Sequence, residues 1–170
     1  MNIRWRVRNV DSLCYEQDGV CIMEIKIIKN GKKDFLDLLL LADQPEKIDQ
    51  YLDRGTLFAL YDDDLKSVCL VTDEGNGCYE IQNLATYEQF QRKGYGRHLV
   101  NHVCDFYREK GNTMLVGTSD VSFYVSFYES CGFVFSHCLE NYILENYDKP
   151  IFEMGVQLKH KVYLKMNLQA

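Results

Sequence analysis

The feature that most constrains the fold is a run of three short apolar stretches separated by tight-turn residues. The stretches 56–61, 65–72 and 78–86 have the length of strands, and Asp62-Asp63-Asp64 and Gly75-Asn76-Gly77 lie between them. Turns as short as these join neighbouring antiparallel strands, because a parallel pair needs a long crossover connection. We therefore expect a three-stranded antiparallel meander in the middle of the chain.

The segment before this meander predicts one more strand and two helices. Residues 23–29 alternate between apolar and charged side chains and end at Asn30-Gly31, which is typical of a strand followed by a turn. Residues 32–41 predict a helix. A second helix is expected to begin near Pro45 and to end at Gly55, because proline suits the first helical position.

After residue 90 the apolar period changes from two to about 3.6. Apolar residues between Tyr95 and Tyr107 recur on one face, which predicts a helix. Near the end of the chain Lys161, Tyr163 and Lys165 alternate with apolar residues, so they are expected to form the solvated face of a closing strand. The other elements expected here are a buried strand, a helix and a strand, over residues 113–117, 122–131 and 133–138.

The length and uniform composition predict one domain rather than several. The chain has 170 residues, without repeats, low-complexity tracts or a linker-like segment. Residues 23–170 are expected to form this domain, because the regular alternation starts at Met23. Residues 1–22 are either an extension that precedes a natural translation start at Met23 or an extra edge strand, and the sequence favours neither alternative.

Charge and composition disfavour several classes of protein. The formal net charge is −6, which is the wrong sign for a protein that coats nucleic acid. The apolar run 38–42 is far shorter than the ~20 residues that span a bilayer, and no signal-peptide pattern follows Met1. The seven cysteines form no C-x-x-C pair, so we expect no zinc site and a reduced, cytoplasmic protein without a membrane partner.

The segment 91–97 is the candidate anion-binding site. It reads Gln-Arg-Lys-Gly-Tyr-Gly-Arg, and it links an expected strand to an expected helix. The first N–H groups of a helix lack internal acceptors, and glycine lets a large anion approach the backbone closely. We therefore expect a phosphate or pyrophosphate here. The alternative is that Gly94 and Gly96 only permit a tight turn.

Two familiar phosphate-binding motifs fit this segment poorly. A P-loop needs a lysine followed by serine or threonine after its second glycine, and the chain has no such run. A dinucleotide-binding loop needs a third glycine where Leu99 stands, although Asp120 lies near the position of a ribose-binding acid. The dinucleotide interpretation is weakened rather than excluded.

Two blocks in the right order resemble the GNAT superfamily of N-acetyltransferases. The pattern Gln91-x-x-Gly94-x-Gly96 resembles its acetyl-CoA pyrophosphate loop, and Phe127-Tyr128-Glu129-Ser130-Cys131-Gly132-Phe133 resembles a second signature about 35 residues later. The tail Tyr147-Asp148-x-Pro150-Ile151-x-Glu153 is similar to small bacterial members. The resemblance implies an α/β (α+β) fold: a mixed, largely antiparallel twisted sheet of about seven strands flanked by helices.

The resemblance also implies how acetyl-CoA binds. The backbone of residues 84–86 would hold the pantetheine arm, and the loop amides and cations would hold the pyrophosphate. The family often has an asparagine at the position of Val121, so a nearby hydroxyl, Ser119, is expected to replace it. The implied cofactor-binding residues are Leu84, Ala85, Thr86, Gln91, Arg92, Lys93, Gly94, Tyr95, Gly96, Arg97 and Ser119.

In catalysis the resemblance assigns Tyr128 as the general acid that protonates the leaving thiolate. Glu80 stands where several members keep a carboxylate base, although its side chain would equally well face solvent. The acceptor would be a primary amine of a small molecule or peptide that attacks the thioester directly in a ternary complex, without metal. The residues expected to shape its site, or simply to form an acidic surface loop, are Tyr142, Glu145, Tyr147 and Asp148.

The expected function is therefore N-acetyl transfer from acetyl-CoA to an amine. One rival is a catalytically silent acyl-CoA-binding or sensor module, which would keep the loop but would not need Glu80 or Tyr128. A second rival is a nucleotide-binding oxidoreductase. Two copies of a family member often pair through an edge strand or the last strand, which makes a homodimer an expectation of the resemblance.

Overall fold

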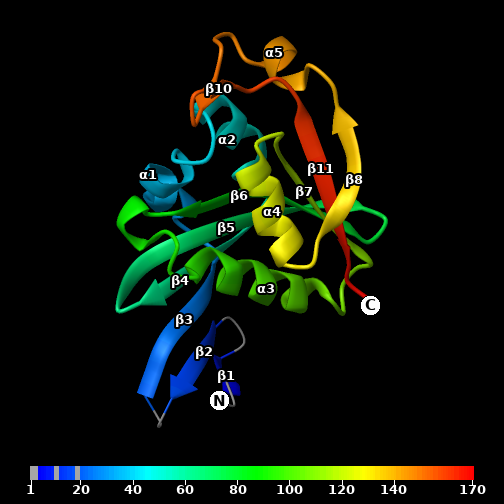
Figure 1. Cartoon of the computed structure of the whole chain (residues 1–170). Coiled ribbons are helices and arrows are strands. Elements are labelled where there is room, and N and C mark those ends of the chain that lie inside the picture. Colours follow the sequence, from blue (N-terminus) through cyan, green and yellow to red (C-terminus); the bar gives the residue numbers. More distant parts are fainter. Residues whose placement is uncertain (1–3, 10–11, 18–19) are drawn as a thin grey trace. The chain divides into compact units, whose positions relative to one another are not determined.

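The computed structural model describes the backbone of residues 4–9, 12–17 and 20–170 and the side chains from residue 23 on (Figure 1). The chain divides into two compact units. Unit 1 contains residues 1–72 and 82–106, and unit 2 contains residues 73–81 and 107–170. Strands β5 and β6 and helix α3 each contribute residues to both units.

Unit 1 is built on antiparallel strands that follow one another in chain order. They are β1 (Arg4–Asn9), β2 (Ser12–Gln17), β3 (Val20–Ile28), β4 (Thr56–Asp62) and β5 (Asp64–Gly75), and the second half of β6 (Cys78–Thr86) follows β5. Figure 1 shows β3, β4 and β5 as neighbours. The predicted meander is confirmed as β4, β5 and β6. The boundary proposed at residue 23 stays a prediction, and β3 runs across it.

Two short helical segments pack their leucines into the core of unit 1. The predicted helix over 32–41 is a 3₁₀ turn, η1 (Lys32–Phe35), followed by one α-helical turn, α1 (Leu36–Leu39). Helix α2 (Pro45–Tyr51) begins at the proline, as predicted. Lys32 Nζ donates to the carbonyls of Leu52 (2.9 Å) and Asp53 (3.0 Å), where an ammonium neutralises the negative end of α2. Leu38, Leu39 and Ile48 share one hydrophobic cluster with Leu57 and Leu70 of the strands.

Helix α3 (Tyr95–Tyr107) packs its apolar face against β4 in unit 1. The rings of Phe106 and His102 meet Phe58 edge to face, with centroid distances of 5.2 and 6.0 Å. Burial lowers the pKa of His102 to about 4, while the charge of Asp105 opposes the shift. His102 is therefore a neutral packing residue at physiological pH.

We predict that His102 makes the protein lose stability in acid. Because its pKa is about 4 when folded and near 6.5 when unfolded, the unfolded state binds more protons between these values. The free energy of unfolding should fall by about 3 kcal/mol as the pH drops through this window. Urea titrations at pH 7 and pH 4 would measure the fall. It should be smaller in H102Q and unchanged in H98Q, one turn earlier; equal falls in all three proteins would contradict the prediction.

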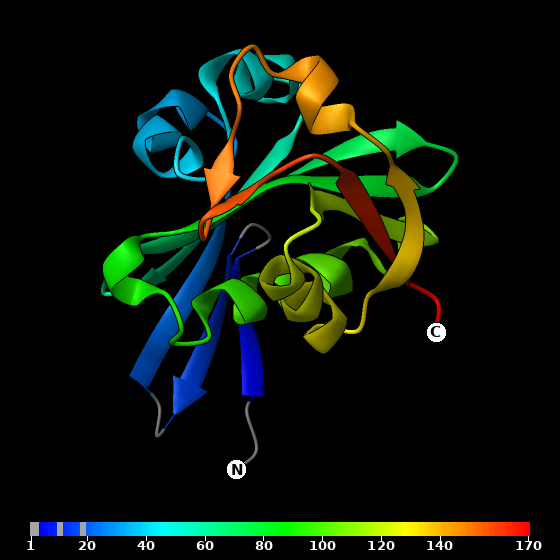
Figure 2. The same cartoon turned by 45° about the horizontal axis from the view of Figure 1, so that its top comes forward.

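Unit 2 is built on a mixed set of strands. The first half of β6 pairs in parallel with β7 (Thr113–Ser119), which is antiparallel to β11 (Lys161–Asn167), and β11 is antiparallel to β8 (Val134–Leu139). Figure 2 shows β7, β11 and β8 side by side. The parallel pair requires a crossover, and the chain between β6 and β7 supplies α3 for it.

The remaining elements of unit 2 are short. Helix α4 (Ser122–Ser130) was predicted, whereas α5 (Tyr142–Asn146), β9 (Phe152–Glu153) and β10 (Val156–Gln157) were not. Apart from β1, β2, β9 and β10, the described residues hold seven strands, all antiparallel to their printed partners except in the β6–β7 pair. The predicted α/β fold with a mixed, largely antiparallel sheet is confirmed. No helix among residues 4–9, 12–17 and 20–170 is long and apolar enough to cross a membrane.

Candidate functional site

The loop between β6 and α3 in unit 1 has the backbone conformation of an anion-binding turn. A 3₁₀ turn, η2 (Glu88–Phe90), leads into it, and Arg92 and Gly94 have φ values of 63° and 93°. The first helical hydrogen bond runs from the His98 N–H to the Gly94 carbonyl (3.0 Å). The first N–H groups of a helix generally have no acceptor in the preceding turn, so this end of α3 suits an anion.

Gln91 stabilises this loop through two hydrogen bonds. Its Nε2 donates to the Thr86 carbonyl (3.1 Å), and its backbone N–H donates to the Glu88 carbonyl (3.2 Å). These bonds tie the end of β6 to the turn that precedes α3. Gln91 therefore has a structural role here, and its contact with a cofactor stays a prediction.

Tyr95 anchors the start of α3 to β4. Its hydroxyl donates to Asp62 Oδ2 (2.6 Å), and this hydrogen bond, together with burial and the nearby carboxylates, raises the pKa of Tyr95 to about 12. Tyr87 makes a similar bond to Asp37 Oδ2 (2.6 Å), which raises the pKa of Tyr87 to about 12. Both phenols stay protonated at neutral pH and act as hydrogen-bonded anchors.

Positive side chains gather around the same loop. Arg92, Lys93 and Arg97 are exposed, as sequence analysis expected of groups that meet a pyrophosphate. Lys66 Nζ lies 3.9 Å from the ring centroid of Phe90, and Lys93 Nζ lies 5.5 Å from the same ring. Phe90 thus holds two ammonium groups near the loop by cation–π contact. The four cations and the helix N-terminus favour a polyanionic ligand.

At the end of β6, the strand before the loop, side chains form hydrogen bonds with the backbone and with one another. Ser67 Oγ donates to the Ala85 carbonyl (2.8 Å) and lies 2.9 Å from Thr86 Oγ1. Next to them, buried Asn83 donates through Nδ2 to the Leu39 carbonyl (3.0 Å) and to Tyr51 Oη (2.9 Å). The segment 84–86 is therefore fixed by side chains from β5 and from within β6, which suits a rigid slot for an extended ligand.

Glu80, the predicted base, belongs to unit 2 and shares its sheet face with a lysine and a tyrosine. Glu80 pairs with Leu115 of β7, while Tyr163 of β11 pairs with Gly117. Residues that pair or lie two apart point to one face, so Glu80, Tyr163 and Lys161 are on the same side. Besides burial, Lys161 and Glu80 are among the groups that shift the pKa of Tyr163, which places the three side chains close together.

The expectation that Lys161 and Tyr163 form a solvated face is wrong. Both are half-buried, whereas Lys165 and Asn167 of the same face are exposed. The Tyr163 ring stacks on His137 of β8, at 4.7 Å between centroids and 7° between planes. Lys161 Nζ lies 4.9 Å from the Tyr163 ring centroid and 5.2 Å from that of Tyr142. Burial raises the pKa of Tyr163, so its phenol is neutral at physiological pH.

Gly117 explains why these long side chains can fold back over the sheet. A Cβ on Gly117 would lie 3.1 Å from Lys161 Nζ and 3.1 Å from Tyr163 Cζ, and it would overlap Lys161 Cε. Any other residue would push the lysine away from β7. A glycine inside a strand indicates close approach of another group, and this signal in the sequence was overlooked.

Tyr128, the predicted general acid, lies on α4 with its ring largely buried. It is 8% exposed, and its ring meets Phe127 (5.0 Å) and Phe133 (5.7 Å) edge to face. Ser119 ends β7 and pairs with Lys161. The structure thus gathers the predicted cofactor residues 84–97 in unit 1, whereas Glu80, Ser119 and Tyr128 belong to unit 2. Their catalytic and binding roles stay predictions.

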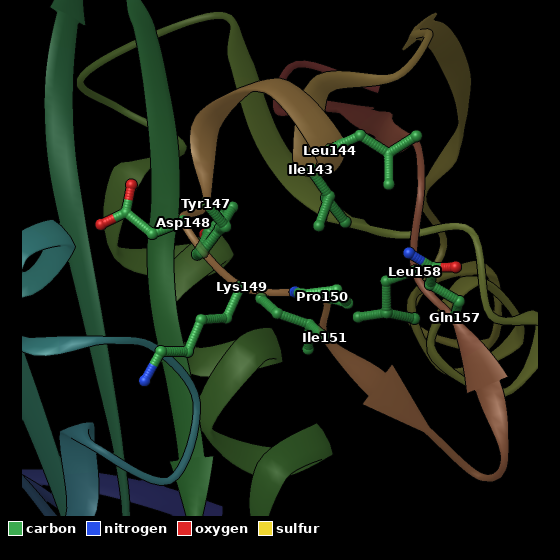
Figure 3. A pocket seen from close by; sticks show the side chains of 9 residues that line it. All are labelled: Ile143, Leu144, Tyr147, Asp148, Lys149, Pro150, Ile151, Gln157 and Leu158. Carbon is green, nitrogen blue, oxygen red and sulfur yellow. The ribbon is translucent and has the colours of Figure 1, made fainter.

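The predicted acceptor residues of unit 2 divide among three surroundings. Tyr142 contacts Lys161, and Glu145 is exposed on α5. Tyr147 and Asp148 line a pocket of about 240 Å³. Figure 3 shows that Ile143, Ile151 and Leu158 gather around this pocket, while the charged ends of Asp148 and Lys149 point away from them. The pocket lining therefore combines apolar side chains with polar groups, and the two charged ends lie toward its outside.

A metal centre has no candidate in the part of the chain that the structure describes. No group of three or more His, Cys, Asp or Glu side chains in those residues is arranged to hold a metal ion. His98 and His102 stand four residues apart on α3, but His102 packs its ring against Phe58.

Three comparisons with known proteins all identify acetyltransferases as similar to this chain. The family model described as "Acetyltransferase (GNAT) family" matches residues 29–133. The uncharacterized N-acetyltransferase YvbK of Bacillus subtilis strain 168 is 33% identical over 150 residues, which cover 86% of this chain and 97% of YvbK. A Bacillus subtilis acetyltransferase solved with CoA has a TM-score of 0.79 and 31% identity, over 84% of this chain and 97% of its own. A GNAT acetyltransferase of Elizabethkingia anophelis solved with acetyl-CoA has a TM-score of 0.81 and 30% identity, over 86% and 98%.

Proposed function

Because the chain belongs to the acetyltransferase (GNAT) family, we propose that it transfers the acetyl group of acetyl-CoA to a primary amine of a small molecule or peptide. The matched proteins solved with CoA and with acetyl-CoA support the choice of cofactor. Catalysis proceeds in a ternary complex, by direct attack of the amine on the thioester.

The observation that carries this proposal is the loop at the start of α3. Its backbone turns at Arg92 and Gly94, it leads into the N-terminus of α3, and the side chains around it are cationic. These residues fit a pyrophosphate well. We assign the amides from Arg92 to Gly96, with Arg92, Lys93 and Arg97, to the pyrophosphate, and the backbone of 84–86 to the pantetheine arm.

The acid and base of the reaction come from unit 2. A free primary amine has a pKa of about 10.4, so at neutral pH a base must remove a proton before the amine can attack. Glu80 takes this proton. The thioester C–S bond breaks as the new C–N bond forms, and Tyr128 gives its proton to the departing thiolate.

The protein acts in the cytoplasm, according to the same proposal. The cysteines with described side chains, Cys69, Cys78, Cys104, Cys131 and Cys138, are all free thiols, which is typical of a reducing compartment.

Thermal unfolding with three ligands in parallel tests the cofactor. A ligand at a hundred times its dissociation constant stabilises the folded state by about 2.7 kcal/mol, and a chain of this size shifts by about 2–4 °C per kcal/mol. We expect a rise of several degrees in Tm with acetyl-CoA and with CoA, and no rise with NAD. A rise with NAD alone would favour an oxidoreductase and overturn the proposal.

Release of free thiol from acetyl-CoA then tests transfer itself. A panel of a monoamine, a polyamine, an amino acid and a peptide α-amine would be compared with an amine-free blank. Amine-dependent thiol release is the expected result. Binding of acetyl-CoA without turnover on any amine would favour the silent acyl-CoA-binding module instead.

A further inference from the structure

We propose that Tyr163 and Lys161 are positioning residues that hold the Glu80 carboxylate in one orientation and in its ionised form. This inference rests on the proposed function, in which Glu80 takes the proton of the acceptor amine. Neither residue touches the reacting atoms in this scheme, and both act through Glu80.

The strand register places the three side chains on one face of the sheet, in successive rows. Glu80 of β6 pairs with Leu115, and Tyr163 of β11 pairs with Gly117, two residues further along β7. Lys161 lies two residues before Tyr163, on the same face of β11. On this face β7 presents Leu115, the bare backbone of Gly117 and Ser119, and the space over Gly117 lets the β11 side chains extend toward Glu80.

The hydrogen-bonding capacities of the three groups allow only one arrangement. A lysine ammonium can only donate, and an ionised carboxylate can only accept. A Tyr163 hydroxyl that lies between the two accordingly accepts from Lys161 and donates to Glu80. This chain fixes the direction of the phenol proton, and the phenol in turn holds one oxygen of Glu80.

Aromatic contacts fix the positions of Tyr163 and Lys161. Tyr163 is stacked on His137, and the Lys161 ammonium lies over the rings of Tyr163 and Tyr142. A lysine that only served solubility would leave its ammonium in water. Lys165, four residues later on the same face of β11, is exposed in this way. The space for Lys161 depends on Gly117, so the glycine and the lysine form one feature.

The charge of Lys161 favours the ionised form of Glu80. The titratable groups around Glu80 are Lys161, Tyr163 and Lys165 from β11, Tyr142 from α5, His137 from β8 and Cys78 from β6, while β7 contributes none. Glu80 raises the pKa of Cys78 and is among the causes that raise the pKa of Tyr163, which places it close to both. Burial disfavours the charge of Lys161, whereas Tyr163 and then Glu80 raise its pKa, so the ammonium and the Glu80 carboxylate attract each other.

The pH profile of kcat/KM provides the test. In K161M, which keeps the length of the side chain and removes the charge, the acid limb should move upward by about one pH unit. The loss in activity should then approach about tenfold at pH values below the limb and be nearly absent at pH values well above it. Y163F, which keeps the ring on His137, should move the limb in the same direction, and K161R should restore it.

Two controls make the result decisive. K165M removes the same charge from the same strand face at an exposed position, and it should leave the limb in place. E80Q should abolish the acid limb, which identifies the limb with Glu80. A limb that stays in place in K161M and Y163F, while E80Q removes it, would overturn the inference and leave the proposed function intact. A wild-type protein without acetyl transfer would overturn the proposed function itself.

Folding of each variant is checked through binding of CoA at the proposed loop of unit 1. An unchanged rise in Tm with CoA shows that a variant is folded. If K161M fails this check, the acid limbs of the pH profiles are compared between wild type, Y163F and K161R. A uniform loss of activity at all pH values, rescued by neither conservative variant, would mean a merely structural role for Lys161 and would also contradict the inference.

Discussion

Replacing Gly94 by valine is expected to abolish acetyl-CoA binding, with a loss of affinity of at least ~100-fold, equivalent to about 2.7 kcal/mol. Gly94 has a φ of 93°, a region where a β-branched residue is an outlier and where an L-residue pays roughly 1–2 kcal/mol or more. A Cβ at this position would meet only His98, at 3.8 Å, so there is room for a side chain and the backbone conformation is the obstacle. Valine would turn the loop out of its conformation and shield the first N–H groups of α3. Calorimetric titration with CoA measures the affinity directly.

The matched control for this variant is Gly75→Val. Gly75 also has a positive φ (84°), and a Cβ on it would contact nothing within 4 Å. The substitution therefore imposes a similar backbone strain in a turn of unit 2, away from the proposed loop. G75V should lose stability and keep its affinity for CoA. Affinity retained in G94V would contradict the proposed pyrophosphate site, and affinity lost equally in both variants would point to a general loss of fold.

The parts of the fold that could be predicted are those whose signal is local. The strand Cys78–Thr86 has the predicted bounds, because a regular alternation lies between a Gly-Asn-Gly turn and a loop with two glycines. The helix expected over 32–41 is mostly a 3₁₀ turn with one α-helical turn, because four consecutive leucines cannot share one helix face. Leu38 and Leu39 are buried while Leu40 and Leu41 are exposed, and the chain turns there instead of continuing.

The segment between β8 and β11 could not be predicted, because distant backbone groups determine its conformation. The Asn141 N–H donates to His160 Nδ1 (3.0 Å), and the Ile143 N–H donates to the Lys159 carbonyl (3.0 Å). These bonds join the two ends of the segment across about 18 residues. The pattern of apolar residues does not indicate such long-range hydrogen bonds. For this reason α5, β9 and β10 were not predicted from the sequence.

The candidate site shows the same division. The loop at Gly94 was found from sequence because glycine, a strand and a helix start stand next to one another in the chain. Lys161 and Tyr163 were assigned to solvent, because alternation separates the two faces of a strand but cannot say which one is covered. Their contact with Glu80 depends on the order β6-β7-β11 and on the missing side chain of Gly117. Only the register between strands reveals it.

Removing the hydroxyl of Tyr128 is expected to slow turnover by about 10²–10³-fold, because general acid catalysis typically contributes 10²–10⁴-fold. Y128F keeps the edge-to-face contacts of the ring with Phe127 and Phe133, so the fold should be retained. The affinity for CoA should be nearly unchanged, since the pyrophosphate loop belongs to unit 1. Single-turnover measurement of thiol release, with calorimetric titration of CoA beside it, separates the two effects.

Tyr79→Phe is the control that distinguishes loss of the general acid from loss of any other tyrosine hydroxyl in unit 2. The Tyr79 ring packs on Tyr107 at 4.1 Å, and its hydroxyl donates to the Lys110 carbonyl (3.3 Å). Y79F therefore removes one tyrosine hydroxyl from unit 2 while the ring contact stays, and its turnover should equal that of the wild type. If Y128F turned over as fast as Y79F across the pH range, another group would protonate the thiolate and Tyr128 would be a packing residue of α4. A loss confined to Y128F, with CoA affinity unchanged, assigns the leaving-group proton to Tyr128.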